Sequence, residues 1–389
     1  SADSTLPFEQ HRDLFYLTGV DQEETILVLC PDAKDPKQRE MGFVRATNAH
    51  IAVWEGHKLT KSEATAVTGI DNVQWTADFE ASFLELAKQV DNIYINTNEH
   101  YRAKVETQTR EDRFIAWCKE QFPKKNYEKS NFILQGLRGV KDPEEIAHIQ
   151  QACDITEKGF KRVLGFVTPG VWEFEIEAEF AHEFLRNRSK GFAYTPIIAS
   201  GANSNVLHYI ENSQQCQAGE LILMDVGAEY GNYSSDMTRT IPVSGRFTPR
   251  QRTVYEAVLK VKDEATQLLM PGVLWKAYHI EVGKLMSSAL VDIGLLTKKE
   301  MSDNAEAYKK YFMHGTSHHL GLDTHDYGLL DEPMEANMVF TVEPGIYIPD
   351  EGFGIRLEDD VVVQATGAPV NLMANIPIDP DEIEALMNP

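Results

Sequence analysis

Two pairs of facing acidic residues constrain this chain more than any other feature of its sequence. The first pair lies in residues 221–243, LILMDVGAEYGNYSSDMTRTIPV, where an apolar run, a Gly-Asn turn signal and an alternating run predict a β-hairpin. Folding it about the Tyr230–Gly231 bond places Asp225 opposite Asp236. Like charges on opposed residues repel, by roughly 3 kcal/mol at an effective dielectric of about 20. A cation between the two carboxylates would offset that repulsion.

The same pattern recurs near the end of the sequence. Residues 339–363, VFTVEPGIYIPDEGFGIRLEDDVVV, contain two apolar runs separated by a turn signal. Folding about the Asp350–Glu351 bond brings Glu343 opposite Glu358. Two hairpins that lie far apart in the sequence therefore each present a facing carboxylate pair, and this coincidence indicates a metal site.

A histidine-rich segment lies between the two hairpins. Residues 311–328, YFMHGTSHHLGLDTHDYG, contain His314, His318, His319 and His325. This density favours a metal site over four unrelated core or surface histidines. The residues by themselves do not identify which histidine is the ligand.

The charge of the acidic residues predicts how many ions they bind. Four carboxylates carry four negative charges, which two divalent cations would neutralise. An oxygen-rich set with one imidazole suits Mn²⁺, Co²⁺ or Fe²⁺ rather than structural zinc. Two such ions share a bridging water and lower its pKa, which gives hydroxide at neutral pH. Only Arg239 and Arg356 lie in the hairpins to clamp a phosphoryl group, so the sequence favours amide hydrolysis.

Composition excludes several classes of partner. The formal net charge of −23 argues against binding to nucleic acid or to an anionic membrane. No apolar run approaches the roughly 18–20 residues of a membrane span. The four scattered cysteines include no C-x-x-C pair, so we expect reduced thiols in a cytoplasmic protein.

The length of 389 residues predicts two domains. Residues 1–130 are predicted to form a small α/β domain, and it lacks the Gly-rich loop of a nucleotide site. Its expected strands cover residues 24–31, 41–46, 50–56 and 92–97, and its expected helices cover residues 79–90 and 110–122.

Residues 131–389 are predicted to form the larger domain. Asp142, Pro143 and Glu145 supply N-cap, N1 and N3 signals for a helix that continues to residue 164. Three further helices are expected over residues 174–188, 248–269 and 275–293. Four helices packed against a largely antiparallel, curved sheet make an α+β fold. One carboxylate hairpin in each half of the domain hints at an internal duplication.

From about Leu137 onward, the sequence resembles the catalytic domain of the M24 "pita-bread" metallopeptidases, and within them the Xaa-Pro aminopeptidases (aminopeptidase P). The matching motifs are LHYIEN around His208, LMDVGAEYGNYSSDMTRTIPV, HGTSHHLGLDTHD, TVEPGIYI and GIRLEDD. The resemblance implies a pita-bread catalytic domain preceded by a creatinase-N-terminal-like domain. That leading domain starts short relative to typical bacterial members, so we expect a segment before Ser1.

The resemblance also implies a ligand set. The five implied ligands are Asp225, Asp236, His318, Glu343 and Glu358. Asp236 and Glu358 would bridge both ions, Asp225 would hold one ion, and His318 with Glu343 would hold the other. The implied cofactor is a pair of Mn²⁺ ions, with Co²⁺, Fe²⁺ or Zn²⁺ as alternatives.

Two non-ligand histidines, His208 and His325, resemble family residues that touch the substrate. An imidazole beside the metals can donate to the developing oxyanion or shuttle a proton. Glu343 is also a candidate general base, which would pass a proton toward the leaving nitrogen. Arg356, on the strand face of Glu358, is expected to orient a carboxylate or His325.

Three further positions lie close to these motifs in sequence. Tyr347 is expected either to hydrogen-bond within the site or to pack beneath it. His314 resembles a position near the metal shell and is a candidate substrate contact. His319 stands where the family often has tryptophan, which puts substrate-facing packing at that position in doubt.

The implied function is release of the N-terminal residue from peptides with proline in the second position, by attack of a metal-bridged hydroxide on the Xaa-Pro amide. The implied partners are an Xaa-Pro peptide and further copies of the chain, as a homodimer or a dimer of dimers. Prolidase, which cleaves only Xaa-Pro dipeptides, is the first alternative, although the HGTSHHLGLDTHD wording favours the aminopeptidase. A non-catalytic pita-bread module that binds peptides is a further alternative. Methionine aminopeptidase usually lacks the leading domain, and creatinase lacks the metals.

Overall fold

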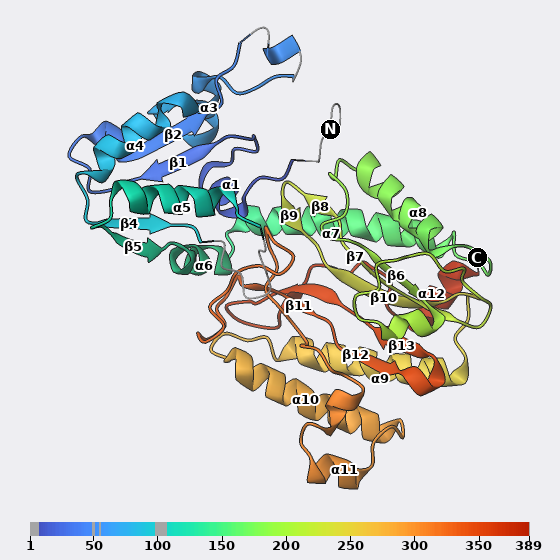
Figure 1. Cartoon of the computed structure of the whole chain (residues 1–389). Helices are drawn as coiled ribbons and strands as arrows, with labels where there is room; N and C mark the ends of the chain where they lie inside the picture. The colour runs from blue at the N-terminus through green and yellow to red at the C-terminus, as the bar shows by residue number, and fades with distance from the viewer. Residues whose placement is uncertain (1–7, 49–50, 54–55, 98–106, 389) are drawn as a thin grey trace. The chain divides into compact units, whose positions relative to one another are not determined.

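The computed structural model describes residues 8–48, 51–53, 56–97 and 107–388. The chain separates into two compact units, residues 1–134 and 135–389. In Figure 1 the first unit runs from blue to teal and the second from green to red.

The first unit is an α/β arrangement with two small sheets. Strands β1, β2 and β3 form one sheet, in which β1–β2 is antiparallel and β2–β3 is parallel, and β4 pairs with β5 in parallel. Its core is aromatic, with Phe79, Phe83 and Phe114 in mutual ring contact. The elements are α1 (Arg12–Thr18), β1 (Ile26–Leu29), η1 (Pro36–Gln38), β2 (Glu40–Val44), α3 (Lys61–Thr68), β3 (Val73–Trp75), η2 (Thr76–Asp78), α4 (Phe79–Ala87), β4 (Asn92–Ile95), α5 (Arg110–Gln121) and β5 (Asn126–Lys129).

Most of the elements predicted for this part of the chain are present, but one strand prediction is wrong. Residues 51–53, within the strand expected over residues 50–56, are helical; residues 50, 54 and 55 lie outside the described part of the chain. A short apolar run fits a helix as well as a strand, because periodicity cannot separate them over so few residues. All four cysteines of the chain are free thiols, as predicted, and all four are buried.

The second unit contains the two carboxylate hairpins. Helix α6 (Asn131–Gly139) bridges the boundary between the units. The remaining elements are α7 (Pro143–Leu164), α8 (Glu173–Arg186), β6 (Ile197–Ser200), η3 (Gly201–Asn205), β7 (Leu221–Val226), β8 (Glu229–Tyr230), β9 (Tyr233–Ser234), β10 (Met237–Pro242), α9 (Pro249–Gln267), α10 (Trp275–Asp292), α11 (Lys298–Asp303), η4 (Ala307–Lys310), β11 (Val339–Val342), β12 (Gly345–Ile348), η5 (Pro349–Glu351), β13 (Phe353–Arg356), β14 (Asp359–Val362), β15 (Val370–Asn371) and α12 (Pro380–Met387).

The four long helices predicted for this unit are α7, α8, α9 and α10. Helix α7 begins as predicted, since the Asp142 side chain accepts from the Glu145 backbone and the Glu145 side chain accepts in return. Helix α7 packs against α8, which contacts β6, and α10 packs against α9, which contacts β11, β12 and β13. Figure 1 shows the strands of this unit between these two helix pairs.

A seam between two antiparallel sheets brings the hairpins together. The order β10–β7–β6 forms one sheet, and β11–β14–β15 forms another, with β12–β13 as a two-stranded extension. At the seam, the Glu358 backbone donates to the Thr238 carbonyl at 3.0 Å. The Thr240 hydroxyl donates to the Arg356 carbonyl at 3.1 Å. Strand β10 of the first hairpin therefore runs beside the Glu358 segment of the second.

The register predicted for the first hairpin is wrong by two residues. Asp225 pairs with Thr238, not with Asp236, because the turn is centred on Gly231 and Asn232. Both turn residues have positive φ, 59° and 69°, as a tight two-residue hairpin turn requires. Since side chains alternate between faces along a strand, a shift of two preserves the face. Asp236 is therefore a diagonal neighbour of Asp225, still within reach of a shared ion.

The register predicted for the second hairpin is confirmed. Gly345 pairs with Arg356 in β12–β13, and Val342 pairs with Asp359 in β11–β14. Glu343 and Glu358 occupy the interval between these two ladders, at positions opposite each other.

The positive φ at the first turn gives a test of its geometry. Gly231→Ala should lower the free energy of unfolding by about 1–2 kcal/mol, because a Cβ is unfavourable at positive φ. A Cβ there would also lie 3.0 Å from the His148 ring. Thermal denaturation measures the change, with Gly136→Ala in helix α6 as control, since no atom lies within 4 Å of a Cβ at Gly136. Equal melting temperatures for the two variants would contradict the assigned turn.

Candidate metal centre

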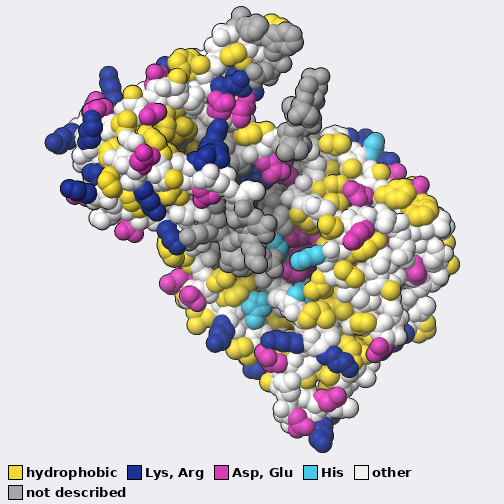
Figure 2. All heavy atoms as spheres, viewed as in Figure 1, with side chains coloured by type: hydrophobic (Ala, Val, Ile, Leu, Met, Phe, Trp, Pro, Cys, Tyr) yellow, Lys and Arg dark blue, Asp and Glu magenta, His cyan; other side chains and the backbone are white. Residues whose placement is uncertain are grey.

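Three ligand-type side chains meet where the sheets join. One donor atom from each of Asp236, His318 and Glu358 lies within 4.8 Å of the others. The His318 Nε2 atom lies 3.4 Å from Asp236 Oδ2 and 3.7 Å from Glu343 Oε1. Figure 2 shows histidine side chains gathered beside acidic ones on this face of the second unit. Asp236 immediately precedes β10, and Glu358 lies between β13 and β14, so the seam itself creates the cluster.

The backbone orients the imidazole of His318. Its Nδ1 atom lies 2.9 Å from the His319 carbonyl oxygen, and its backbone N–H donates to the Thr341 hydroxyl at 3.1 Å. Since a carbonyl can only accept, Nδ1 carries the proton and Nε2 is left with its lone pair toward the carboxylates. This is the tautomer that a metal ligand requires.

Asp225 is held from both sides by neutral and charged donors. Arg356 donates to its Oδ2 at 2.5 Å, and the Tyr194 hydroxyl donates to its Oδ1 at 2.6 Å. The same hydroxyl also lies 2.6 Å from Asp236 Oδ1. Tyr194 was not among the predicted site residues, because it lies in an irregular segment before β6 where no motif or periodicity marks it.

The electrostatics of the cluster are those of crowded, buried carboxylates. Burial raises the pKa of Asp236 well above its usual value, and repulsion from Asp225 adds to the rise. Burial also raises the pKa of Glu358, with repulsion from the other three carboxylates contributing. Burial raises the pKa of Glu343 to about 7, against the opposing pull of His318. Without a cation, these groups hold protons that they would lose in water.

This donor set fits divalent metal ions. Carboxylate oxygens with one imidazole nitrogen are ligands for hard or borderline divalent cations. Positive charge at the cluster would offset the repulsion that raises the carboxylate pKa values. Metal binding therefore competes with protons at these positions.

A second layer of hydrogen bonds connects three predicted site residues. Arg356 Nη1 donates to the Tyr347 hydroxyl at 2.9 Å, and that hydroxyl lies 2.7 Å from His314 Nε2. His314 Nδ1 lies 2.8 Å from the Gly315 carbonyl and 3.6 Å from Glu343 Oε2. The structure thus links His314, Tyr347 and Arg356 in a chain that ends at Asp225. Tyr347 is both buried and hydrogen-bonded, so the two readings offered for it are compatible.

His208 lies on an ordered loop with its own side chain exposed. The loop is fixed by Glu173, a fully buried carboxylate at the start of α8. Glu173 accepts from the backbone and the hydroxyl of Ser200, both at 2.7 Å. It also accepts from the Tyr209 hydroxyl and the Gln214 backbone, both at 2.8 Å. Glu173 was not predicted from the sequence, because nothing local distinguishes it from other glutamates at helix starts.

The remaining two histidines of the 311–328 segment have different surroundings. The His325 ring lies against His318, with centroids 3.8 Å apart. His319 is buried and stacks on Trp275, with ring centroids 6.1 Å apart and planes inclined by 14°. Its ring centroid also lies 4.4 Å from that of Phe340. Desolvation lowers the pKa of His319 to about 3, so this residue is a neutral packing group.

The two hairpin arginines are engaged in ion pairs. Arg356 pairs with Asp225, as above, and Arg239 is fully buried, with Nη2 2.6 Å from Asp359 Oδ1. Lys262 also pairs with Asp359, whose pKa these two cations hold far below its usual value although burial opposes them. Arg239 therefore has no free guanidinium to clamp a phosphoryl group, which agrees with amide chemistry.

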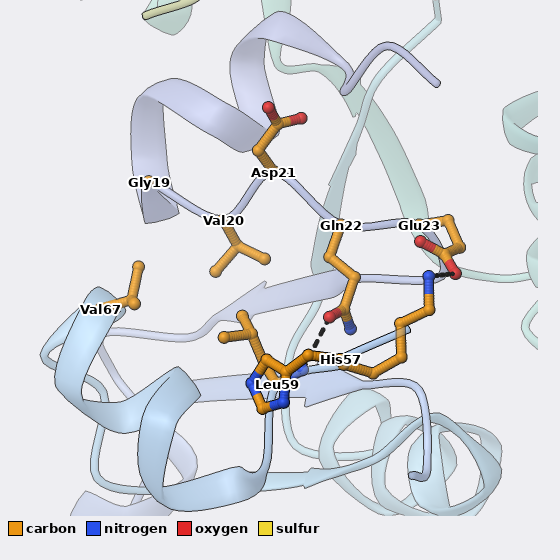
Figure 3. A pocket seen from close by; sticks show the side chains of 9 residues that line it. Gly19, Val20, Asp21, Gln22, Glu23, His57, Leu59 and Val67 are labelled. Atoms are coloured by element: carbon orange, nitrogen blue, oxygen red, sulfur yellow. Dashed lines mark hydrogen bonds and ion pairs between the residues drawn. The ribbon is translucent and has the colours of Figure 1, made fainter. Parts of the chain in front are cut away.

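The first unit contains a separate pocket of about 340 Å³ (Figure 3). Lys58 on its wall pairs with Glu23 at 2.6 Å, and Gln22 accepts from the Leu59 backbone at 2.8 Å. The described residues that line it are Gly19, Val20, Asp21, Gln22, Glu23, His57, Lys58, Leu59 and Val67. It lacks the crowded carboxylates that characterise the metal centre.

Comparison with known proteins identifies the family. Residues 147–365 match the family model described as "Metallopeptidase family M24", and residues 1–94 match "Aminopeptidase P, N-terminal domain". The Xaa-Pro aminopeptidase of Escherichia coli is 35% identical over 403 aligned residues, which cover 100% of this chain and 90% of the relative. The chain belongs to metallopeptidase family M24.

Solved structures of M24 proteins agree with this assignment. The zinc-substituted E. coli aminopeptidase P in complex with product superimposes with a TM-score of 0.90 at 33% identity, covering 100% of this chain and 91% of that one. Proline aminopeptidase P II from Yersinia pestis gives a TM-score of 0.89 at 33% identity, covering 100% and 92%. The expected fold class, an α+β pita-bread catalytic domain with a smaller N-terminal α/β domain, is confirmed. The M24 family and the donor set together support a metallohydrolase that uses divalent metal and acts on peptides.

Helices long and apolar enough to cross a membrane do not occur among the described residues of this M24 protein.

The raised carboxylate pKa values predict a pH-dependent response to metal removal. Glu343 keeps its proton in the folded state up to about pH 7, but its ordinary pKa is 4.5. Between these values the unfolded chain binds fewer protons, so the chelated protein loses stability as the pH rises. The increase in melting temperature on replacing EDTA by Mn²⁺ should therefore be larger at about pH 8 than at about pH 5. Equal increases at both pH values would contradict this reading.

The Tyr194 hydroxyl gives a second test. Tyr194→Phe removes the donor shared by Asp225 and Asp236, so metal affinity should fall by about 10- to 100-fold. Calorimetric titration with Mn²⁺ measures the change. Tyr255→Phe is the matched control, since that buried hydroxyl donates to the Ile378 carbonyl at 2.7 Å. Identical Mn²⁺ affinities in the two variants would show that the Tyr194 hydroxyl does not support the metal centre.

Proposed function

We propose that this protein is a divalent-metal aminopeptidase that releases the N-terminal residue from peptides with proline in the second position. The observation that carries the proposal is the convergence of five ligand-type side chains from two hairpins and a histidine-rich loop. The E. coli relative named Xaa-Pro aminopeptidase aligns with 100% of this chain. The human relative named Xaa-Pro aminopeptidase 3 aligns with 99% of this chain at 30% identity. The proposed ligands are Asp225, Asp236, His318, Glu343 and Glu358.

We propose that two divalent ions bind here and would be held by Asp225, Asp236, His318, Glu343 and Glu358. Arg356 already pairs with Asp225, and the other carboxylates leave negative charge for divalent cations. The mixed oxygen and imidazole set favours Mn²⁺ over softer alternatives. When bound, the ions supply Lewis-acid polarisation of the substrate carbonyl and a nucleophilic water at neutral pH.

Glu343 is the proposed general base. A carboxylate within reach of the attacking water can accept its proton and later return it. Proline's amide nitrogen has no hydrogen, so the leaving group must be protonated as the bond breaks. Glu343 can hold the proton taken from the attacking water and deliver it to that nitrogen.

His208 and His325 are the proposed contacts to the substrate carbonyl. An imidazole N–H aimed at the developing oxyanion stabilises the transition state more than the ground state. Arg356, by pairing with Asp225, holds that ligand in one orientation. The Tyr347 hydroxyl hydrogen-bonds to both Arg356 and His314, and it thereby fixes the His314 ring. His314 lies near Glu343, so we propose it as a substrate contact.

We also propose that the protein assembles as a homodimer or a dimer of dimers, on the basis of the family resemblance. Light scattering after size exclusion measures the mass directly.

The decisive experiment is a peptidase assay with matched substrates and variants. With Mn²⁺, an Xaa-Pro-Xaa peptide should be cleaved faster than an Xaa-Pro dipeptide, and chelator should abolish both activities. Preference for the dipeptide would instead identify a prolidase, and a metal-free, inactive, well-folded protein would identify a binding module.

Loss of a proposed ligand should remove activity and metal together. Asp236→Ala and Glu358→Ala should each abolish turnover and lower the bound metal measured by mass spectrometry, because each would remove a donor from the group that lies within 4.8 Å of its partners. Asp381→Asn is the control, since Asp381 lies on exposed helix α12 and pairs with Arg252. A fully active Asp236→Ala or Glu358→Ala variant would contradict the proposed function.

A further inference from the structure

The loop that carries His325 has no regular secondary structure of its own. Residues 321–328, called here the His325 segment, lie outside helices and strands. Yet the His325 ring is held against the ligand His318, with centroids 3.8 Å apart. A loop without ladder hydrogen bonds needs other contacts to hold a side chain in one place.

Arg138, near the end of α6, contacts the His325 segment at three points. Its Nη2 atom pairs with Asp323 Oδ2 at 2.7 Å and also with Asp326 Oδ1. Its guanidinium carbon lies 4.7 Å from the ring centroid of Tyr327. Asp323 precedes His325 in the chain, and Asp326 and Tyr327 follow it. Arg138 therefore contacts the segment on both sides of the histidine.

Lys141 completes the arrangement around Asp326. Its Nζ atom lies 3.0 Å from Asp326 Oδ2 and donates to the Arg138 carbonyl at 2.6 Å. Asp326 Oδ1 also accepts from the Tyr327 backbone at 2.8 Å, and the Asp326 backbone donates to the His319 carbonyl at 2.9 Å. Both carboxylate oxygens of the residue that follows His325 are therefore fixed.

These charges are buried. The side chains of Arg138, Lys141 and Asp326 are exposed by only 2%, 1% and 1%. Although burial opposes it, Lys141 and Arg138 hold the pKa of Asp326 below its usual value, so the carboxylate stays ionised. Buried ion pairs contribute little net stability compared with apolar packing, and their best-attested use is to specify one conformation.

Close packing at Gly321 gives independent support. A Cβ at this position would lie 2.1 Å from Asp326 Oδ2 and 2.9 Å from Lys141 Cε. The segment closes so tightly on the ion pair that its first residue has no room for a side chain. The Gly321 carbonyl also accepts from the Ser234 backbone at 2.8 Å, which ties this end of the segment to β9 of the first hairpin.

We propose that Arg138 and Asp326 are positioning residues for His325. Neither is a metal ligand, and they act by fixing the path of the His325 segment so that its imidazole faces the metal centre. The inference rests on the proposed function, in which His325 contacts the substrate carbonyl.

The first variant, Arg138→Lys, keeps the positive charge and removes the planar guanidinium group with its several donors. Arg138→Lys retains one cation, but an ammonium cannot pair with Asp323 and Asp326 and also cover the Tyr327 ring. We expect kcat to fall by about 10- to 100-fold, the range for a misplaced catalytic group, while bound metal and KM stay unchanged. The control is Arg250→Lys, because Arg250 makes a comparable two-point pair with Glu351 at 2.7 and 2.8 Å on the exposed surface.

A double-mutant cycle separates positioning from general damage. If Arg138 acts through His325, then Arg138→Lys should cost nothing further in a His325→Ala background. Losses that multiply in the double variant would overturn the proposal, because they would mean that Arg138 supports the site by another route. Asp323→Asn provides a milder variant, since that side chain is 40% exposed; it should lower kcat in the same direction and by less.

Hydrogen–deuterium exchange provides a readout independent of activity. In Arg138→Lys, amide exchange should rise in peptides covering residues 321–328 and not in those covering β7 or β10. Unchanged exchange in the His325 segment would overturn the proposal even if activity fell. A wild-type protein that fails to cleave Xaa-Pro peptides would count against the proposed function, and exchange would still decide whether Arg138 holds the segment.

Discussion

The close approach of four carboxylates is the constraint on which the catalytic unit depends. Asp225 and Asp236 come from one hairpin, Glu343 and Glu358 from the other, and each feels the repulsion of its neighbours. Gathering ionised groups in a buried site is unfavourable unless cations neutralise them. The seam between β10 and the Glu358 segment forms at this cost. Metal binding and completion of the fold are therefore coupled, and metal competes with protons for the carboxylates.

Most of the negative charge of the carboxylate cluster is not neutralised by the arginine and lysine side chains near it. Arg239 and Lys262 neutralise Asp359, next to Glu358 in the chain, and Arg356 pairs with Asp225 at the edge of the site. Such pairing stabilises the strands that carry the ligands and fixes their rotamers. It leaves the negative charge of the remaining carboxylates for divalent ions.

The two histidines proposed to contact substrate lie on irregular loops, and buried charge organises both. Glu173 accepts hydrogen bonds at 2.8 Å from Tyr209 and Gln214 in the loop that contains His208, and at 2.7 Å from Ser200 at the end of β6. Arg138 and Asp326 do the same for His325. In each loop, buried charge replaces the regular hydrogen bonds of a sheet. This design costs stability relative to an apolar contact but restricts the loop to one path.

Strand alternation is a local property, so it was sufficient to predict which acidic side chains share a face and the register of the second hairpin. The four long helices could likewise be predicted from the sequence, because capping residues and the helical period are local features. The pairing of Asp225 with Thr238 could not be predicted locally, because a turn shifted by one residue moves the register by two. The residues by themselves left open which of four histidines is the ligand, and the family resemblance implied His318. The tertiary structure places His318 Nε2 beside Asp236 and Glu343. It also brings Tyr194 and Arg138 to this region from distant segments. Those choices depend on packing between parts of the chain that no local pattern connects.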